Sequence, residues 1–111
     1  MENKIDKSLL SGSTAMLILR LLELGDMYGY QMIEALKKQS NNLFTLKAGT
    51  LYPLLHGLEH DGAVKSYEII AGNDRSRKYY SITNSGRKLL KTKKDEWEIY
   101  SSAINFIMEG I

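Results

Sequence analysis

Two histidines and a glutamate stand at a spacing that could hold a metal ion. His56, Glu59 and His60 match the pattern H-x-x-E-H, which inverted zinc peptidases carry on one helix. This spacing places both imidazoles on one helical face, as a zinc site needs. No third protein ligand can be identified, and Gly57 weakens a helix at this point. A small zinc hydrolase is therefore one alternative, and two solvent-facing histidines without a metal are the other.

Positive charge is concentrated in one stretch of the chain. Residues 63–94 carry nine lysines and arginines against two carboxylates, a net charge of +7, whereas the rest of the chain carries a net charge of −5. A basic segment on an otherwise acidic chain is the electrostatic footprint of a protein that binds a polyanion. A solvated helix face next to a charged hairpin would give the same count.

The composition excludes several classes of protein. The 111 residues suffice for one domain, and 43% hydrophobic and 25% charged residues are typical of a soluble globular protein. There is no apolar run long enough to cross a membrane and no signal peptide. The absence of cysteine excludes disulfides and fits a reducing cytoplasm. These features lead us to expect a cytoplasmic protein. We find neither a nucleophile–base pair nor a phosphate-binding glycine loop, so we expect no enzyme activity, metal or cofactor.

A short helix and a β-hairpin must position the charged and histidine side chains. Four leucines between residues 51 and 58 follow helical spacing and form one apolar stripe. Thr50 can cap the start of this helix, which puts Pro53 in the first turn, where its missing N–H costs little. Gly62 can end the helix in a left-handed conformation.

The hairpin follows directly. Residues 64–70 and 78–82 are rich in β-branched and aromatic residues, and Gly72, Asn73 and Asp74 lie between them as a turn. A short helix followed at once by a hairpin with a basic tip is typical of a winged helix-turn-helix, a DNA-binding module.

Two more helices precede this unit. Residues 13–24 predict one helix, which Ser11 or Ser13 can cap, and residues 28–39 predict another. Residues 1–12 form either a frayed tail or an extra helical turn. Residues 43–46 form a short extended link that either pairs with the hairpin or fills the core.

A long helix ends the chain. Thr83 caps it, and its apolar residues from Leu90 onward follow a heptad that only Lys93 interrupts. So small a domain cannot cover this stripe, and we expect a second copy of the chain to do so. The predicted dimer interface consists of Leu90, Trp97, Tyr100, Ile104, Ile107, Met108 and Ile111.

The expected fold class is therefore mainly α with a small β-hairpin. We expect a winged helix-turn-helix DNA-binding domain over residues 1–83 and a dimerisation helix over residues 84–111.

Four motifs carry a family resemblance. They are Tyr28-Gly29-Tyr30-Gln31-Met32, Gly49-Thr50-Leu51-Tyr52-Pro53, Leu58-Glu59-His60-Asp61-Gly62 and Arg77-Lys78-Tyr79-Tyr80-Ser81-Ile82-Thr83. In their order and spacing over roughly residues 13–97, the chain resembles the PadR-type bacterial transcriptional regulators. The resemblance implies a winged-helix dimer that represses genes and is released by a small aromatic ligand. The single C-terminal helix is similar to the short branch of that family. Family members usually carry a Lys or Arg near positions 56–57, where this chain has His56 and Gly57.

Candidate DNA contacts fall at three places: the outer face of the third helix, the N-terminus of the second helix, and the hairpin tip. Hydroxyl groups can bond phosphates or bases, a Pro ring or a Thr methyl can touch a thymine methyl, and a helix N-terminus suits a phosphate. Cations of the wing position a protein and carry little sequence information. The predicted residues are Tyr28, Tyr30, Gln31, Lys47, Thr50, Tyr52, Pro53, His56, Arg75, Arg77 and Lys78. Alternatively Tyr52 packs in the core, Thr50 only caps its helix, and Gly29 only serves a turn.

A ligand site is expected in the middle of the last helix. Trp97 could simply fill the dimer core, or it could form half of an aromatic slot that stacks a planar ligand. Tyr100 and Met16 could line the same slot. The ligand role follows from the family resemblance.

The expected partners are a pseudo-palindromic operator in double-stranded DNA, a second copy of the chain and a small aromatic effector, without a membrane. A winged helix used only for protein–protein contacts is the alternative, against which the basic wing argues.

Overall fold

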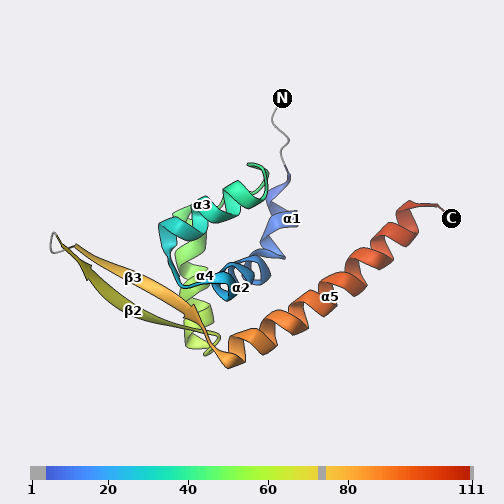
Figure 1. The fold of residues 1–111 in the computed structure, drawn as a ribbon. Coiled ribbons are helices and arrows are strands. Elements are labelled where there is room, and N and C mark those ends of the chain that lie inside the picture. The colour runs from blue at the N-terminus through green and yellow to red at the C-terminus, as the bar shows by residue number, and fades with distance from the viewer. Residues whose placement is uncertain (1–4, 73–74, 111) are drawn as a thin grey trace.

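The computed structural model describes residues 5–72 and 75–110, which form five helices and one three-stranded antiparallel sheet (Figure 1). The helices are α1 (Lys7–Ser11), α2 (Thr14–Leu24), α3 (Gly29–Gln39), α4 (Ala48–His60) and α5 (Asn84–Met108). The strands are β1 (Met27–Tyr28), β2 (Val64–Ala71) and β3 (Arg75–Ile82). The predicted order of helices and hairpin is confirmed.

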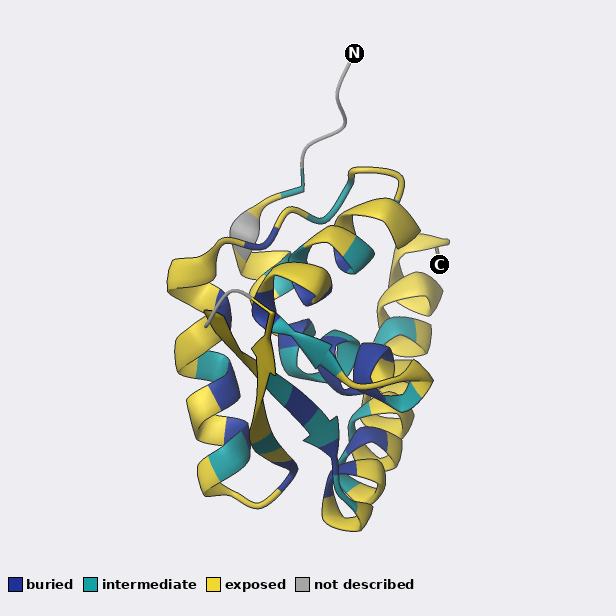
Figure 2. Ribbon diagram, turned by 60° about the vertical axis from the view of Figure 1, so that its left-hand side comes forward, coloured by how far each residue is buried: buried dark blue, intermediate teal, exposed yellow. Residues whose placement is uncertain are grey.

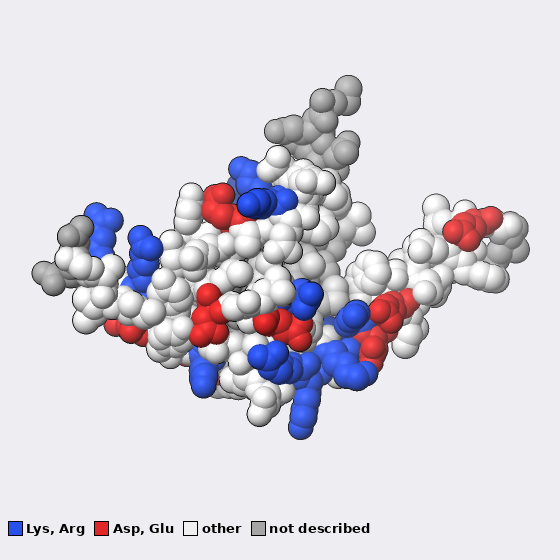
Figure 3. Space-filling view, viewed as in Figure 1, with Lys and Arg blue, Asp and Glu red and all other residues white. Residues whose placement is uncertain are grey.

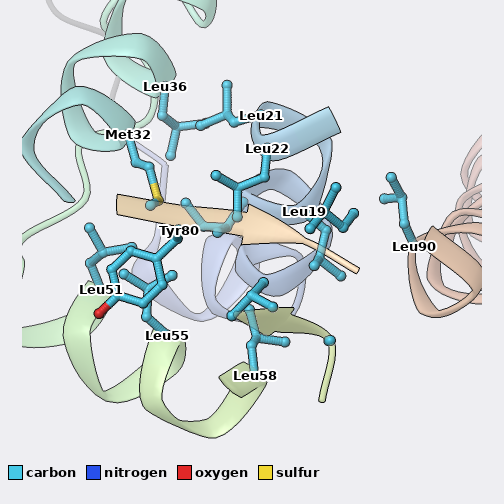
Figure 4. Close-up of a cluster of buried hydrophobic side chains, with 14 of the residues drawn as sticks. Leu19, Leu21, Leu22, Met32, Leu36, Leu51, Leu55, Leu58, Tyr80 and Leu90 are labelled. Atoms are coloured by element: carbon cyan, nitrogen blue, oxygen red, sulfur yellow. The ribbon is translucent and has the colours of Figure 1, made fainter. Parts of the chain in front are cut away.

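Aliphatic side chains from α2, α3 and α4 surround Tyr80 of β3 and form the core (Figure 4). Ile18, Leu51 and Leu55 are fully buried, and the two leucines belong to the apolar stripe that helical spacing predicts for α4. Burial of these side chains is the main source of stability for a domain of this size. The core therefore fixes α4 against the sheet and leaves the opposite face of α4 in solvent.

Helix α4 begins earlier than predicted. The carbonyl of Lys47 accepts from the amides of Thr50, at 3.0 Å, and Leu51, at 2.9 Å, so Thr50 lies inside the helix. The predicted cap at Thr50 is wrong, because Ala48 is a strong helix former and extends the helix backwards. Pro53 is consequently beyond the first turn. Its missing N–H leaves the exposed carbonyl of Gly49 to solvent.

The C-terminal end of α4 matches the prediction. Gly62 has a φ of 79°, and the amide of Ala63 donates to the carbonyl of Leu58 at 2.8 Å. This left-handed ending turns the chain directly into β2.

The sheet has the order β1-β3-β2, and β2 pairs with β3 from Val64–Ile82 to Ala71–Arg75. The sequence does not predict β1, because two residues are too short for a periodic pattern. The link at residues 43–46 does not join the sheet; Leu46 is buried, so the link fills the core. Two residues of the predicted turn, 73 and 74, lie outside the described residues.

Helix α5 starts at the predicted cap, where the amide of Gly86 donates to the hydroxyl of Thr83 at 3.0 Å. Its 25 residues span about 37 Å and carry the helix away from the domain (Figure 1). Most of its second half is exposed (Figure 2). Ile111 of the predicted dimer interface lies outside the described residues.

The N-terminal segment forms the extra helical turn, α1. Asp6 caps it, accepting a bond of 2.9 Å from the amide of Ser8, and this bond lowers the pKa of the Asp6 carboxyl.

Candidate nucleic-acid interface and ligand pocket

The outer face of α4 carries the predicted base-reading residues. Lys47, Thr50, Pro53 and His56 are all exposed. They lie opposite the leucines that hold the helix to the core. This face therefore offers hydroxyl, imidazole and apolar groups to an external partner.

Tyr52 is partly exposed and also packs against a neighbouring helix. Its side chain is 41% exposed, but its hydroxyl lies against the backbone of Gly29. A Cβ at position 29 would overlap that hydroxyl, so glycine allows α3 and α4 to approach closely. Gly29 therefore serves the packing of two helices as well as the turn.

The N-terminus of α3 carries three further predicted residues. Tyr28 is the N-cap residue, and its amide donates to Oε1 of Gln31 at 3.1 Å. Tyr30 is exposed, and the negative charge of Glu34 raises the pKa of its phenol. As a neutral phenol, Tyr30 can donate a hydrogen bond.

The predicted cations of the wing lie on two faces of the hairpin. Arg77 donates from Nη1 to the hydroxyl of Tyr28 at 3.0 Å, with its guanidinium 4.7 Å from the centre of the Tyr28 ring. Lys78 points to the other face, where its Nζ lies 3.9 Å from Glu59. Lysines and arginines are visible over the wing in Figure 3. Of the three predicted cations, Arg75 and Arg77 lie on the face that carries Tyr28.

A tyrosine cluster that the sequence did not predict joins the wing to the helices. The hydroxyl of Tyr67 donates to Oδ2 of Asp26 at 2.6 Å, and this hydrogen bond raises the pKa of Tyr67. The ring of Tyr67 stacks on that of Tyr79 at 5.8 Å, and Tyr79 meets Tyr28 edge-on at 5.4 Å. Alternation along the strands could have placed Tyr67 and Tyr79 on one face, but no local signal points to Asp26.

The metal alternative finds no support. Glu59 accepts a hydrogen bond from the hydroxyl of Ser66 and faces Lys78. Within residues 5–72 and 75–110, no three His, Asp or Glu side chains gather in a way that could hold a metal ion. The histidines of H-x-x-E-H thus stand exposed on α4 while the glutamate binds the wing.

A pocket of about 420 Å³ lies between α1, α2 and the middle of α5. All three predicted ligand residues, Met16, Trp97 and Tyr100, line it. Its other walls are largely aliphatic and aromatic, and its polar groups include Ser101 and Asn105. No Lys, Arg, Asp, Glu or His belongs to the described lining, so the pocket suits an uncharged aromatic molecule.

The model of the transcriptional regulator PadR-like family matches residues 18–92, from α2 into α5. The chain belongs to the PadR-like family. It is a transcriptional regulator and not an enzyme, and its winged-helix fold is that of its relatives. Among the described residues, no helix is both long and apolar enough to cross a membrane.

Relatives of this PadR-type regulator cover nearly its whole length. A transcriptional regulator from Clostridium thermocellum superimposes with a TM-score of 0.83 and 36% identity, over 88% of this chain and 95% of that chain. A PadR family regulator from Eggerthella lenta gives a TM-score of 0.84 and 29% identity, over 94% and 88%. The negative transcriptional regulator PadR of Bacillus subtilis is 30% identical over 66% of this chain, which covers 40% of that protein.

The C-terminal helix of this PadR-type regulator differs in two respects from the predicted interface. Leu90 is buried in the chain's own core, so it is not free for a partner. Trp97 is 49% exposed, and Tyr100, Ile104, Ile107 and Met108 are exposed. The predicted interface does not include Ile99 and Phe106, which are seven residues apart and are 73% and 70% exposed. The exposed apolar face is therefore broader than a narrow coiled-coil seam.

Proposed function

We propose that this PadR-type regulator is a repressor that binds a pseudo-palindromic operator as a homodimer and leaves it when a small aromatic ligand binds. In this proposal residues 1–83 bind DNA and residues 84–111 form the dimer, in the cytoplasm. The observation that carries it is the exposure of the predicted base-reading face of α4 next to a wing with exposed arginines. The Bacillus subtilis relative, named a negative regulator, supports repression.

We assign the DNA contacts as follows. Thr50, Pro53 and His56 face the base edges in the major groove, where the first turns of a recognition helix reach. Phosphates are met by Lys47, by the N-terminus of α3 with Tyr28, Tyr30 and Gln31, and by Arg75 and Arg77. Tyr52 and Lys78 contribute less, because the Tyr52 hydroxyl packs against Gly29 and Lys78 lies on the opposite face of the hairpin from Arg75 and Arg77.

Exposed apolar side chains on α5 support the dimer. Ile99, Phe106 and Ile107 are exposed and are not among the residues that line the pocket, and Tyr100 is exposed although it lines the pocket. An apolar face of this kind marks a contact with another protein. In a two-fold dimer this face of α5 packs against the same face of α5 in the second subunit.

The pocket supports the effector. A flat, uncharged aromatic molecule can stack on Trp97 and bond to Ser101 or Asn105 in a lining that offers it no charge. Such a ligand can release DNA only if it binds more tightly to a dimer geometry that differs from the one that binds DNA. The start of α5 is tied to the end of α4 by the Thr83 hydroxyl, which donates to the carbonyl of Gly62 at 2.6 Å. A shift of α5 therefore reaches the recognition helix directly.

The test is fluorescence anisotropy with a labelled duplex from the region upstream of the regulator's own gene. We expect binding that weakens steeply with salt, with a log–log slope of about 0.9 per neutralised phosphate. A random duplex of equal length is the control and should bind more weakly. If no duplex binds at low salt, the proposed function is wrong, and the winged helix serves protein contacts instead.

A further inference from the structure

Gly57 stands in the interior of α4 on its solvent-exposed side. Its φ is not positive, so the backbone does not require glycine there. A Cβ built at this position meets no other atom within 4 Å. Glycine within a helix is less stable than alanine, so Gly57 weakens α4 without a cause in the described part of the chain.

The other helical glycines sharpen this contrast. The described helices contain Gly29, Gly49, Gly57 and Gly86. A side chain at Gly29 would strike Tyr52, and one at Gly86 would strike the carbonyl of Ala63, so packing explains both. The two glycines with open surroundings, Gly49 and Gly57, both belong to α4. The described part of the chain therefore offers no packing reason for glycine at position 57, which is compatible with a contact that α4 makes outside the chain.

The surroundings of Gly57 indicate a close contact. Helix α4 has no Lys or Arg between Ala48 and His60. A long cationic side chain can reach a guanine while its helix stays back, and Arg or Lys to guanine is the commonest specific contact. Helix α4 lacks this reach, and its neighbouring groups, Thr50, Pro53 and His56, are short. Such groups meet base edges only if the helix itself lies deep in the groove.

We infer that Gly57 is a specificity-determining position, whose missing side chain lets the backbone of α4 lie against the floor of the major groove. This inference rests on the proposed function, because it assumes that α4 enters DNA. The inference gives a role in sequence recognition to a residue that has no side chain with which to bind a base. Any side chain at position 57 holds the helix away and separates Thr50 and Pro53 from the bases they touch.

Two substitutions test this in the full chain, with the upstream duplex and a random duplex as probes. We expect Gly57→Ala to raise the melting temperature by a few degrees, about 3–8 °C, since alanine favours helix and nothing obstructs its methyl group. Affinity for the upstream duplex should fall about 10-fold or more, the scale on which one base is discriminated from another. Affinity for the random duplex should stay unchanged. Gly57→Lys should bind the random duplex more tightly and the upstream duplex more weakly.

Gly12→Ala is the matched control. Gly12 also has a helical backbone, with φ −70° and ψ −18°, and open space around its Cα, but it follows α1 and lies outside α4. It should leave both affinities unchanged. The inference is overturned if Gly57→Ala binds the upstream duplex as the wild type does, if Gly57→Lys binds it more tightly, or if Gly57→Ala melts at a lower temperature. Wild-type protein that binds no duplex would overturn the proposed function, and this inference with it.

Discussion

Single residues decide how closely the elements of this regulator pack. Gly86 lets the first turn of α5 lie against the carbonyl of Ala63 and the side chain of Ile82, where a Cβ would overlap both. The same turn is capped by Thr83, whose hydroxyl donates to the carbonyls of Gly62 and Ala63. The junction between the winged helix and α5 is therefore rigid and intolerant of added atoms.

Gly86→Ala should consequently destabilise the protein. Forcing a methyl group into a packed site costs about 1–3 kcal/mol in the free energy of unfolding. Thermal or urea denaturation measures this loss. Ser85→Ala, at the exposed neighbouring position, is the control and should leave the midpoint nearly unchanged. An unaltered Gly86→Ala midpoint would mean that the junction can yield.

Arg77 and His56 should differ in how their replacement affects DNA binding. Arg77→Ala should weaken binding to all duplexes alike, because a phosphate contact carries no sequence information. His56→Ala should instead change the ranking of sites, by about 1–3 kcal/mol for each base that the imidazole recognises. Competition among duplexes with single base changes measures both. Re-ranking of the sites by Arg77→Ala would contradict this division of roles.

At the scale of elements, the wing is held by side chains rather than by its strands alone. One tyrosine from each strand, Tyr28, Tyr67 and Tyr79, meets the others on one face of the sheet, and Asp26 ties Tyr67 to the start of β1. A two-stranded hairpin by itself is only marginally stable in water. The cluster therefore sets the direction in which Arg75 and Arg77 point.

The hydrogen bond between Tyr67 and Asp26 predicts that the stability of the fold falls at alkaline pH. This hydrogen bond raises the pKa of Tyr67 in the folded state above its ordinary value of 10.0. The stabilisation that this hydrogen bond gives the folded state is fully present below the pKa of an unfolded tyrosine. It disappears as the pH rises through the pKa of Tyr67 in the folded state. Wild type should therefore lose stability relative to Tyr67→Phe above about pH 10. Urea titrations of both proteins from pH 7 to 11 test this, and parallel curves would contradict it.

Helix α5 gives the second prediction at this scale. A chain that ends at Lys94 keeps Leu90 and the core but loses Trp97 and the exposed apolar residues beyond it. It should fold, sediment as a monomer and bind the operator much more weakly, because two linked half-sites no longer act together. Sedimentation velocity of truncated and full chains provides the measurement. A truncated chain that still dimerises would place the interface elsewhere.

At the scale of the whole molecule, the proposed dimer links the pocket to the DNA. Two recognition helices must match major grooves about 34 Å apart on one face of the duplex. The pocket lies against α5, and α5 is joined to α4 through Thr83. In this proposal ligand binding and DNA binding compete through one distance, with a coupling of about 1–3 kcal/mol, which is typical of allosteric proteins.

Planar, uncharged aromatic compounds should quench the fluorescence of Trp97, the only tryptophan in the chain. Trp97→Phe should weaken this binding and Trp97→Ala should abolish it, while both variants remain dimeric. Isothermal titration calorimetry measures the binding, and the operator should lower the affinity for the compound by the same factor by which the compound lowers the affinity for DNA. If the Trp97→Ala variant binds the compound as tightly as the wild type does, Trp97 does not contribute to ligand binding.

The amino-acid sequence by itself determined the main helices, the hairpin and several of their ends, because these depend on neighbouring residues. Helical spacing of leucines predicted α4, the cap at Thr83 predicted the start of α5, and Gly62 predicted the end of α4. The start of α4 was misplaced, since Thr50 and Ala48 are both acceptable starts and only the competition between them decides. Exposure of the predicted base-reading residues also followed from the helical period.

Only the tertiary structure decided which distant residues meet. Asp26 and Tyr67 are 41 positions apart, and no local pattern encodes their bond. The same holds for the contact of Tyr52 with Gly29, for β1, and for the pocket that Met16 and Trp97 share. These contacts depend on how helices and strands pack around one core, and packing is a property of the whole set of side chains rather than of any segment.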